Sequence, residues 1–198
     1  PSAPEPMQVA KVNSIYECTL PLNQRAAHRK GRNLRAGVAP SRLPLMIQGP
    51  LMLDFRRRRW HVMPKIENGE ISGSNPATLH RLDLWRRAGI SVEGRPEWCF
   101  IKLHCHGMIP HDEPSMLGAL HSEFLRALIQ WSRNEGGCQL HFVTAREMVN
   151  IILAACDGHD GEPGRFRDYR LTRISSSESV KQLAPQAQCL QPQRGSNV

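Results

Sequence analysis

Apolar and polar positions alternate in patterns that predict several elements. Residues 45–55 form a nearly continuous apolar run with Gly49-Pro50 in the middle. This run predicts a strand covered on both faces, with a bulge or break at the dipeptide. Residues 74–89 repeat leucines and a tryptophan at helical spacing, and Ser74 or Asn75 is suited to cap the start. These residues are therefore expected to form a helix with one buried face.

The second half of the chain continues this alternation. Asn68-Gly69 is a dipeptide that favours a hairpin turn. Strands are predicted at residues 98–106 and 139–143, and a helix at residues 114–134. The sequence T-x-x-E opens a further helix over residues 144–155 as a capping box.

Strands that alternate with helices indicate βαβ units, and the fold class predicted is α/β with parallel βα units. The visible strands are too few to close a barrel, so this looks like part of a larger α/β fold. The predicted organisation is an irregular segment at 1–44, the α/β region at 45–173 and a Ser-, Gln- and Pro-rich disordered tail at 174–198.

Composition limits the partners. The chain has 198 residues and a net charge of +8, with its densest basic run at residues 56–59. No zinc-finger or RNA-binding pattern accompanies that run, so no nucleic-acid partner is expected. No apolar run approaches the roughly 18 residues of a membrane span. The six cysteines form no CxxC pair, and no signal peptide is visible, so a reducing, cytoplasmic location is predicted.

The strongest candidate chemistry is the pair His104 and His106. Side chains two apart on a strand share a face, so both imidazoles should project together at the carboxyl end of the strand, just before Gly107. One hypothesis is a metal site of these histidines with His111 or Asp112. A second makes either histidine a general acid or base. The structural alternative is a pair of core histidines that are hydrogen-bonded to neighbouring strands.

Two further residues are candidates for binding substrate. Asp54 ends the first strand at the same sheet edge, where it is placed to orient a histidine, bind substrate or anchor an arginine. Arg146 opens the last helix and is available for a ligand, because Glu147 belongs to the capping box. His80 lies off the apolar stripe of its helix and is expected to be exposed.

At this point a family resemblance becomes visible. LMIQGPLMLDFRRRRW, RPEWCFIKLHCHG and LHFVTAREMVNIILAACDG resemble the C-terminal half of bacterial polysaccharide-deacetylase-like proteins, over about residues 1–173. These belong to the glycoside hydrolase/deacetylase β/α-barrel superfamily. The resemblance implies part of a (β/α)7-type deacetylase barrel, incomplete in this chain, and hydrolysis of non-peptide carbon–nitrogen bonds in an acylated amino sugar or polysaccharide.

The same resemblance implies roles for particular residues. Its strand-end Leu-His motif corresponds to FIKLH, which makes His104 the general acid, with His106 as second choice. The implied cofactor is a divalent metal, zinc, whose main ligands belong to motifs in a missing N-terminal half. His106, His111 and Asp112 are the candidates within this chain.

Two other functions are compatible with these residues. One is a non-catalytic half-barrel that binds carbohydrate or pairs with another subunit. The other is a separate metalloprotein that uses the loop at 104–106. An incomplete barrel also predicts that the isolated chain is a poor catalyst and associates through its open edges.

Overall fold

The structure is a computed structural model of the chain. It describes residues 11–20, 23, 30–41, 45–59, 62–107, 109–134 and 137–172. The predicted tail at 174–198 lies outside these ranges.

The first sheet has three antiparallel strands. β1 (Ile15–Cys18) lies between β2 (Gly31–Asn33) and β3 (Leu45–Ile47). All residues of β1 are buried, including Glu17, whose carboxylate accepts hydrogen bonds from Arg32 and Ser41. The first two strands come from the N-terminal segment, and the sheet is completed by the apolar run that follows it.

The second sheet is a hairpin of β4 (Met52–Arg59) and β5 (Met63–Glu67). The predicted interruption at Gly49-Pro50 is confirmed, because the apolar run divides into β3 and β4 on either side of it. The hairpin turn predicted at Asn68-Gly69 is wrong. The chain reverses between Arg59 and Met63 instead, and Gly69 (φ +73°) follows the end of β5.

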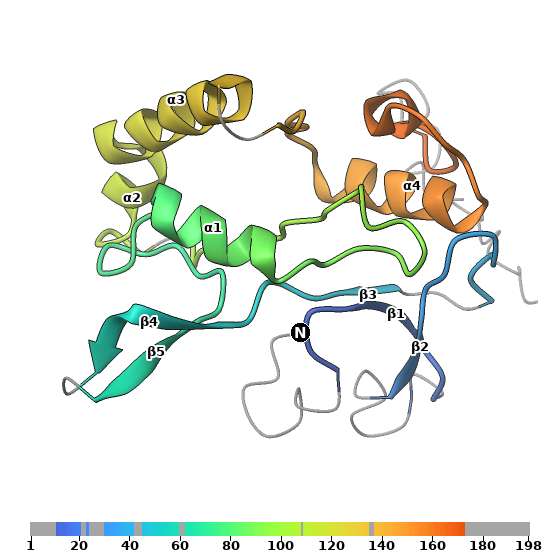
Figure 1. Cartoon of the computed structure of the whole chain (residues 1–198), viewed down its shortest axis with the longest axis horizontal. Helices are drawn as coiled ribbons and strands as arrows, with labels where there is room; N and C mark the ends of the chain where they lie inside the picture. The colour runs from blue at the N-terminus through green and yellow to red at the C-terminus, as the bar shows by residue number, and fades with distance from the viewer. Residues whose placement is uncertain are drawn as a thin grey trace, which may run out of the picture.

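Helix α1 (Leu79–Arg87) packs beside the hairpin (Figure 1). It begins later than predicted, because Thr78 caps it by accepting a hydrogen bond from the backbone amide of Arg81. Its buried face includes Leu82 and Trp85. This placement sets the first turn of α1 against β4.

The remaining helices follow in the second half. The predicted helix at 114–134 is divided into α2 (Glu113–Leu117) and α3 (Ala119–Asn134), because Gly118 has an extended backbone (φ −85°, ψ −178°). Helix α4 (Ala145–Cys156) carries the predicted capping box, which is confirmed. A 3₁₀ turn, η3 (Pro163–Phe166), packs against α4.

The predicted parallel βα barrel architecture is wrong. Both described sheets are antiparallel, and residues 98–106 and 139–143 belong to no strand. The segment at 98–106 makes only one bridge, the parallel contact between Glu70 and His104.

The apolar residues of this segment are buried by helices, and this explains the mistaken prediction. Trp98 and Phe100 enter a cluster with α4 and β1, while Ile101 and Leu103 pack against a second cluster between α1 and α3. A segment that packs against two clusters shows the apolar pattern of a buried strand without needing a strand on each side.

No helix in the described ranges is both long and apolar enough to cross a membrane.

Candidate functional site

A buried ion pair fixes α1 to the hairpin. Glu67, the last residue of β5, accepts two hydrogen bonds of 2.7 Å from the guanidinium of Arg81 on α1. The indole Nε1 of Trp85 and the backbone amide of Gly69 also donate to Glu67, at 2.8 and 2.9 Å. Burial alone would raise the pKa of Glu67, but these donors outweigh it and hold the pKa below its usual value.

The same arginine organises the loop before α1. Arg81 donates to the carbonyl oxygens of Asn75 and Pro76 at 2.6 and 2.8 Å. The side-chain oxygen of the buried Asn75 in turn accepts from Arg57 at 2.7 Å and from Lys65 at 3.1 Å. Two cations of the hairpin are thereby held against the loop.

Asp54 on β4 and His80 on α1 form a second contact between the hairpin and the helix. Asp54 is 1% exposed, and its Oδ1 lies 2.9 Å from Nε2 of His80 in the first turn of α1. The backbone amides of Arg56 and Arg57 donate to the same oxygen at 3.0 and 3.2 Å. These amides turn toward Asp54 because the ladder is irregular between Asp54 and Arg58.

The charge of Asp54 decides which nitrogen of His80 is available. Burial alone would raise the pKa of Asp54, but the hydrogen bonds from His80 and from the two amides lower it below its usual value. An ionised carboxylate only accepts, so Nε2 of His80 carries the proton in this bond. The other nitrogen, Nδ1, lies 3.5 Å from the guanidinium of Arg56, and the imidazole is 26% exposed.

The second oxygen of Asp54, Oδ2, has no hydrogen-bond partner within the described part of the chain, although it is buried. A buried acceptor without a donor lowers stability, and folding alone gives no reason to place one here.

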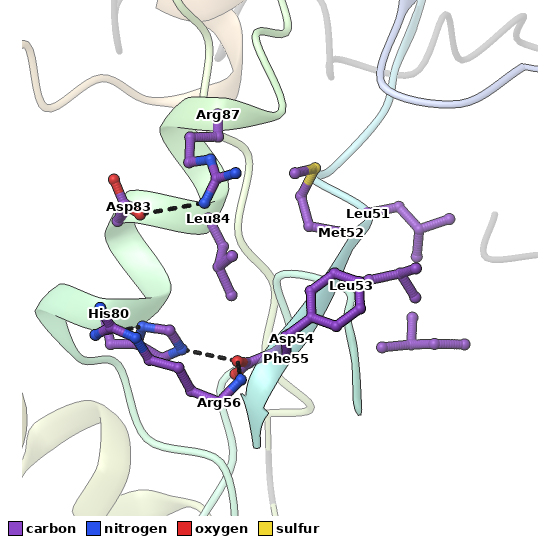
Figure 2. A pocket seen from close by; sticks show the side chains of 11 residues that line it. Leu51, Met52, Leu53, Asp54, Phe55, Arg56, His80, Asp83, Leu84 and Arg87 are labelled. Atoms are coloured by element: carbon purple, nitrogen blue, oxygen red, sulfur yellow. Dashed lines mark hydrogen bonds and ion pairs between the residues drawn. The ribbon is translucent and has the colours of Figure 1, made fainter. Parts of the chain in front are cut away.

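The pair lies in an open cleft of about 630 Å³ between β4 and α1 (Figure 2). The hairpin side supplies most of the apolar lining together with Asp54 and Arg56, whereas α1 supplies Leu84 and the remaining polar groups. The lining residues are Leu51, Met52, Leu53, Asp54, Phe55, Arg56, Ile66, His80, Asp83, Leu84 and Arg87. A mostly apolar cleft with a few convergent polar groups is the usual form of a small-molecule site.

His104 and His106 lie elsewhere. Both are exposed, with ring centroids 6.3 Å apart and planes at 89°, and neither lines the Asp54–His80 cleft. His106 borders a separate cavity of about 400 Å³ together with Cys105 and Asp112. The two imidazoles are therefore close to each other, as their spacing indicated, but not at a sheet edge.

The other metal candidates are held by backbone contacts. Asp112 is buried and accepts a hydrogen bond of 2.8 Å from the amide of Gly73. His111 lies so close to Gly73 that a Cβ there would be 2.5 Å from its Nε2. Across the described ranges, no three His, Cys, Asp or Glu side chains gather as a ligand set.

Arg146 serves the C-terminal segment. Its guanidinium lies 2.6 Å from Asp168 and also donates to the carbonyl oxygens of Arg167 and Leu171. Arg146 thus holds the chain after η3 against α4, and it does not line the Asp54–His80 cleft.

The sequence singled out Asp54 at the end of a strand near His104, but Asp54 lies within β4, in a cleft that His104 does not line, and its partner His80 was expected only to be exposed. The two residues are 26 positions apart, so no local spacing connects them. The start of α1 is the one signal that could have indicated His80. A cap at Thr78 places His80 in the first turn of the helix, which lies against the hairpin.

Comparisons with known proteins give no relative for this chain. No family model matches it, and no curated protein or solved structure matches it either.

Proposed function

We propose that this protein is a hydrolase that removes acyl groups from amino sugars, with His80 as its acid–base residue in the Asp54–His80 cleft. The observation that carries the proposal is the 2.9 Å bond between Asp54 Oδ1 and His80 Nε2. A carboxylate that fixes one nitrogen of a histidine directs the other nitrogen to proton transfer. The partnerless Oδ2 of Asp54 supports a role beyond folding.

The proposed reaction is an attack of water on the amide, with His80 transferring the proton. Nδ1 of His80 accepts a proton from water as the oxygen attacks the amide carbonyl, and the proton then passes to the leaving nitrogen as the carbon–nitrogen bond breaks. The products are the free amine and the carboxylic acid. Asp54 stabilises the imidazolium formed between these steps, because its carboxylate stays ionised. No step is assigned to a metal.

The substrate class comes from the sequence. The resemblance of RPEWCFIKLHCHG to polysaccharide-deacetylase-like proteins supports an acylated amino sugar. The apolar wall of the cleft, with Leu53 and Phe55 exposed, offers a surface for the carbon–hydrogen face of a sugar ring. The resemblance places the general acid on His104, so the two histidines make competing predictions.

Acetate release from N-acetylated chitotetraose separates them. We expect His80→Ala to reduce the rate by about 10²–10⁴-fold, the usual contribution of a general acid or base. His104→Ala is the matched control and should retain the rate of the unmodified protein. Loss of activity in His104→Ala with retention in His80→Ala would return the acid role to His104.

A second candidate is a sugar-binding module without catalysis, favoured by the exposed apolar wall of the cleft. In that case chitotetraose would bind, as measured by titration calorimetry, but no acetate would form. Weakened binding after Phe55→Ala would then locate the sugar in the same cleft.

A further inference from the structure

Arg56 occupies an unusual position in the cleft. Its side chain is exposed and, in the described ranges, makes no ion pair with a carboxylate. Within the same ranges its one side-chain hydrogen-bond contact is that of 3.5 Å to Nδ1 of His80 (Figure 2). Its backbone amide is held by Asp54 at 3.0 Å. The backbone of Arg56 is therefore held in place, whereas its exposed guanidinium has room for a further partner.

The neighbouring cations are already engaged. Arg57 and Lys65 both donate to the side chain of Asn75, and Arg87 at the rim lies 3.8 Å from Asp83. The charge of Asp54 is likewise satisfied on one oxygen by His80 and two amides. Of the two arginines that line the cleft, Arg87 has a carboxylate partner, whereas Arg56 makes no ion pair within the described residues.

We propose that the Asp54–His80 cleft selects acidic sugar chains, and that Arg56 binds a carboxylate of the residue next to the acylated amino sugar. This inference rests on the proposed function and adds the substrate class. A guanidinium matches a carboxylate with two parallel hydrogen bonds, which gives both energy and orientation. Because Arg56 touches His80, a carboxylate bound there places the neighbouring sugar beside Nδ1.

A purely structural role for Arg56 makes a different prediction. If the arginine only positions His80, its removal changes turnover of neutral and acidic chains equally. If Arg56 binds a carboxylate, its removal weakens the binding of acidic chains alone. The two roles are separable by equilibrium binding, which does not depend on proton transfer.

The probes are hyaluronan tetrasaccharide, which alternates glucuronate with N-acetylglucosamine, and N-acetylated chitotetraose, which has the same acetylated sugar without carboxylates. Binding is measured by titration calorimetry at 0.15 M salt, where diffuse attraction is screened. We expect hyaluronan tetrasaccharide to bind about tenfold more tightly, in line with one charge-assisted contact. Arg56→Ala should remove this preference and leave chitotetraose affinity unchanged, and Arg56→Lys should restore part of it.

Arg126→Ala is the matched control, since Arg126 is exposed on α3 outside the cleft and its loss lowers the net charge equally. Equal affinities of the unmodified protein for both probes would overturn the inference. So would an equal effect of Arg126→Ala and Arg56→Ala, which would mean non-specific attraction to a protein of net charge +8. Failure of the proposed function would appear separately, as absent acetate release from both probes with the binding preference intact.

Discussion

At the residue scale, the two buried carboxylates of the hairpin face different situations. Glu67 receives donors on both oxygens, whereas Asp54 has one oxygen without a partner in the described chain. The first arrangement is typical of a structural pair, and the second leaves a cost that stability alone does not explain. Asp54 was predicted to end a strand, but β4 continues to Arg59, and its contact with His80 could not be predicted because it depends on how α1 docks.

The buried pair predicts a large loss of stability. Glu67→Ala removes the counter-charge of Arg81, which is almost fully buried, and leaves its guanidinium uncompensated. We expect a decrease of about 3–5 kcal/mol in the free energy of unfolding, measured with urea.

Asp83→Ala breaks the exposed pair with Arg87 and is the matched control. It should change the same free energy by less than about 0.5 kcal/mol. Similar losses in both variants would mean that the buried Glu67–Arg81 pair stabilises the fold no more than an exposed pair does.

Acid should destabilise the fold through the same carboxylates. Because Asp54 and Glu67 have lowered pKa values, the unfolded chain binds their protons more readily than the folded one. Their contribution is complete above the ordinary values of about 3.9 and 4.3 and is lost as the pH falls toward the lowered ones.

Asp54→Asn removes one of these titrations. We expect the stability difference between the unmodified protein and Asp54→Asn to shrink between pH 6 and pH 3, as followed by urea unfolding at each pH. A difference that widens toward acid would mean that the pKa of Asp54 is raised by folding.

At the element scale, the capping box was a local signal that predicted its helix correctly, whereas the local turn signal at Asn68-Gly69 did not form a hairpin. The T-x-x-E pattern gave both the start and the cap of α4, because a capping box is closed by residues three positions apart. The start of α1 was misplaced among several possible caps, of which Thr78 is the one used. The break at Gly118 was missed, since apolar spacing continues across it from α2 into α3.

The cap of α4 gives a direct test. The hydroxyl of Thr144 accepts a hydrogen bond from the backbone amide of Glu147, and the Glu147 carboxylate accepts one from the amide of Thr144. Thr144→Ala should cost about 0.5–2 kcal/mol in the free energy of unfolding, by chemical denaturation. Thr144→Ser keeps the hydroxyl and should lose little; a loss as large as that of alanine would point to the methyl group instead of the cap.

At the scale of the whole molecule, the parallel architecture failed because strand identity depends on distant partners. Residues 98–106 have the apolar pattern of a buried strand, but α4 lies on one side and the α1–α3 cluster on the other. The backbone makes one bridge, at Glu70 and His104. Periodicity reports which side chains are buried and not whether a helix or a strand buries them.

The hairpin leaves the molecule with an exposed apolar face. Leu53 and Ile66 are directly opposite each other on β4 and β5, and they are 50% and 60% exposed, beside Phe55 at 64%. A two-stranded sheet with such a face is a site for association, because contact between copies removes this surface from water. We expect the isolated chain to associate as its concentration rises, as measured by sedimentation velocity.

Replacing both Leu53 and Ile66 with threonine tests this surface while keeping strand-forming side chains. The double variant should sediment as a monomer over the same concentrations and lose only part of its unfolding free energy, because both replaced side chains are at least half exposed. Leu120→Gln on α3 also removes an exposed leucine, 60% exposed, and should associate as the unmodified protein does. If Leu120→Gln abolishes association and the double variant does not, the contact lies on the helical side of the molecule and the cleft stays open to substrate in the associated form.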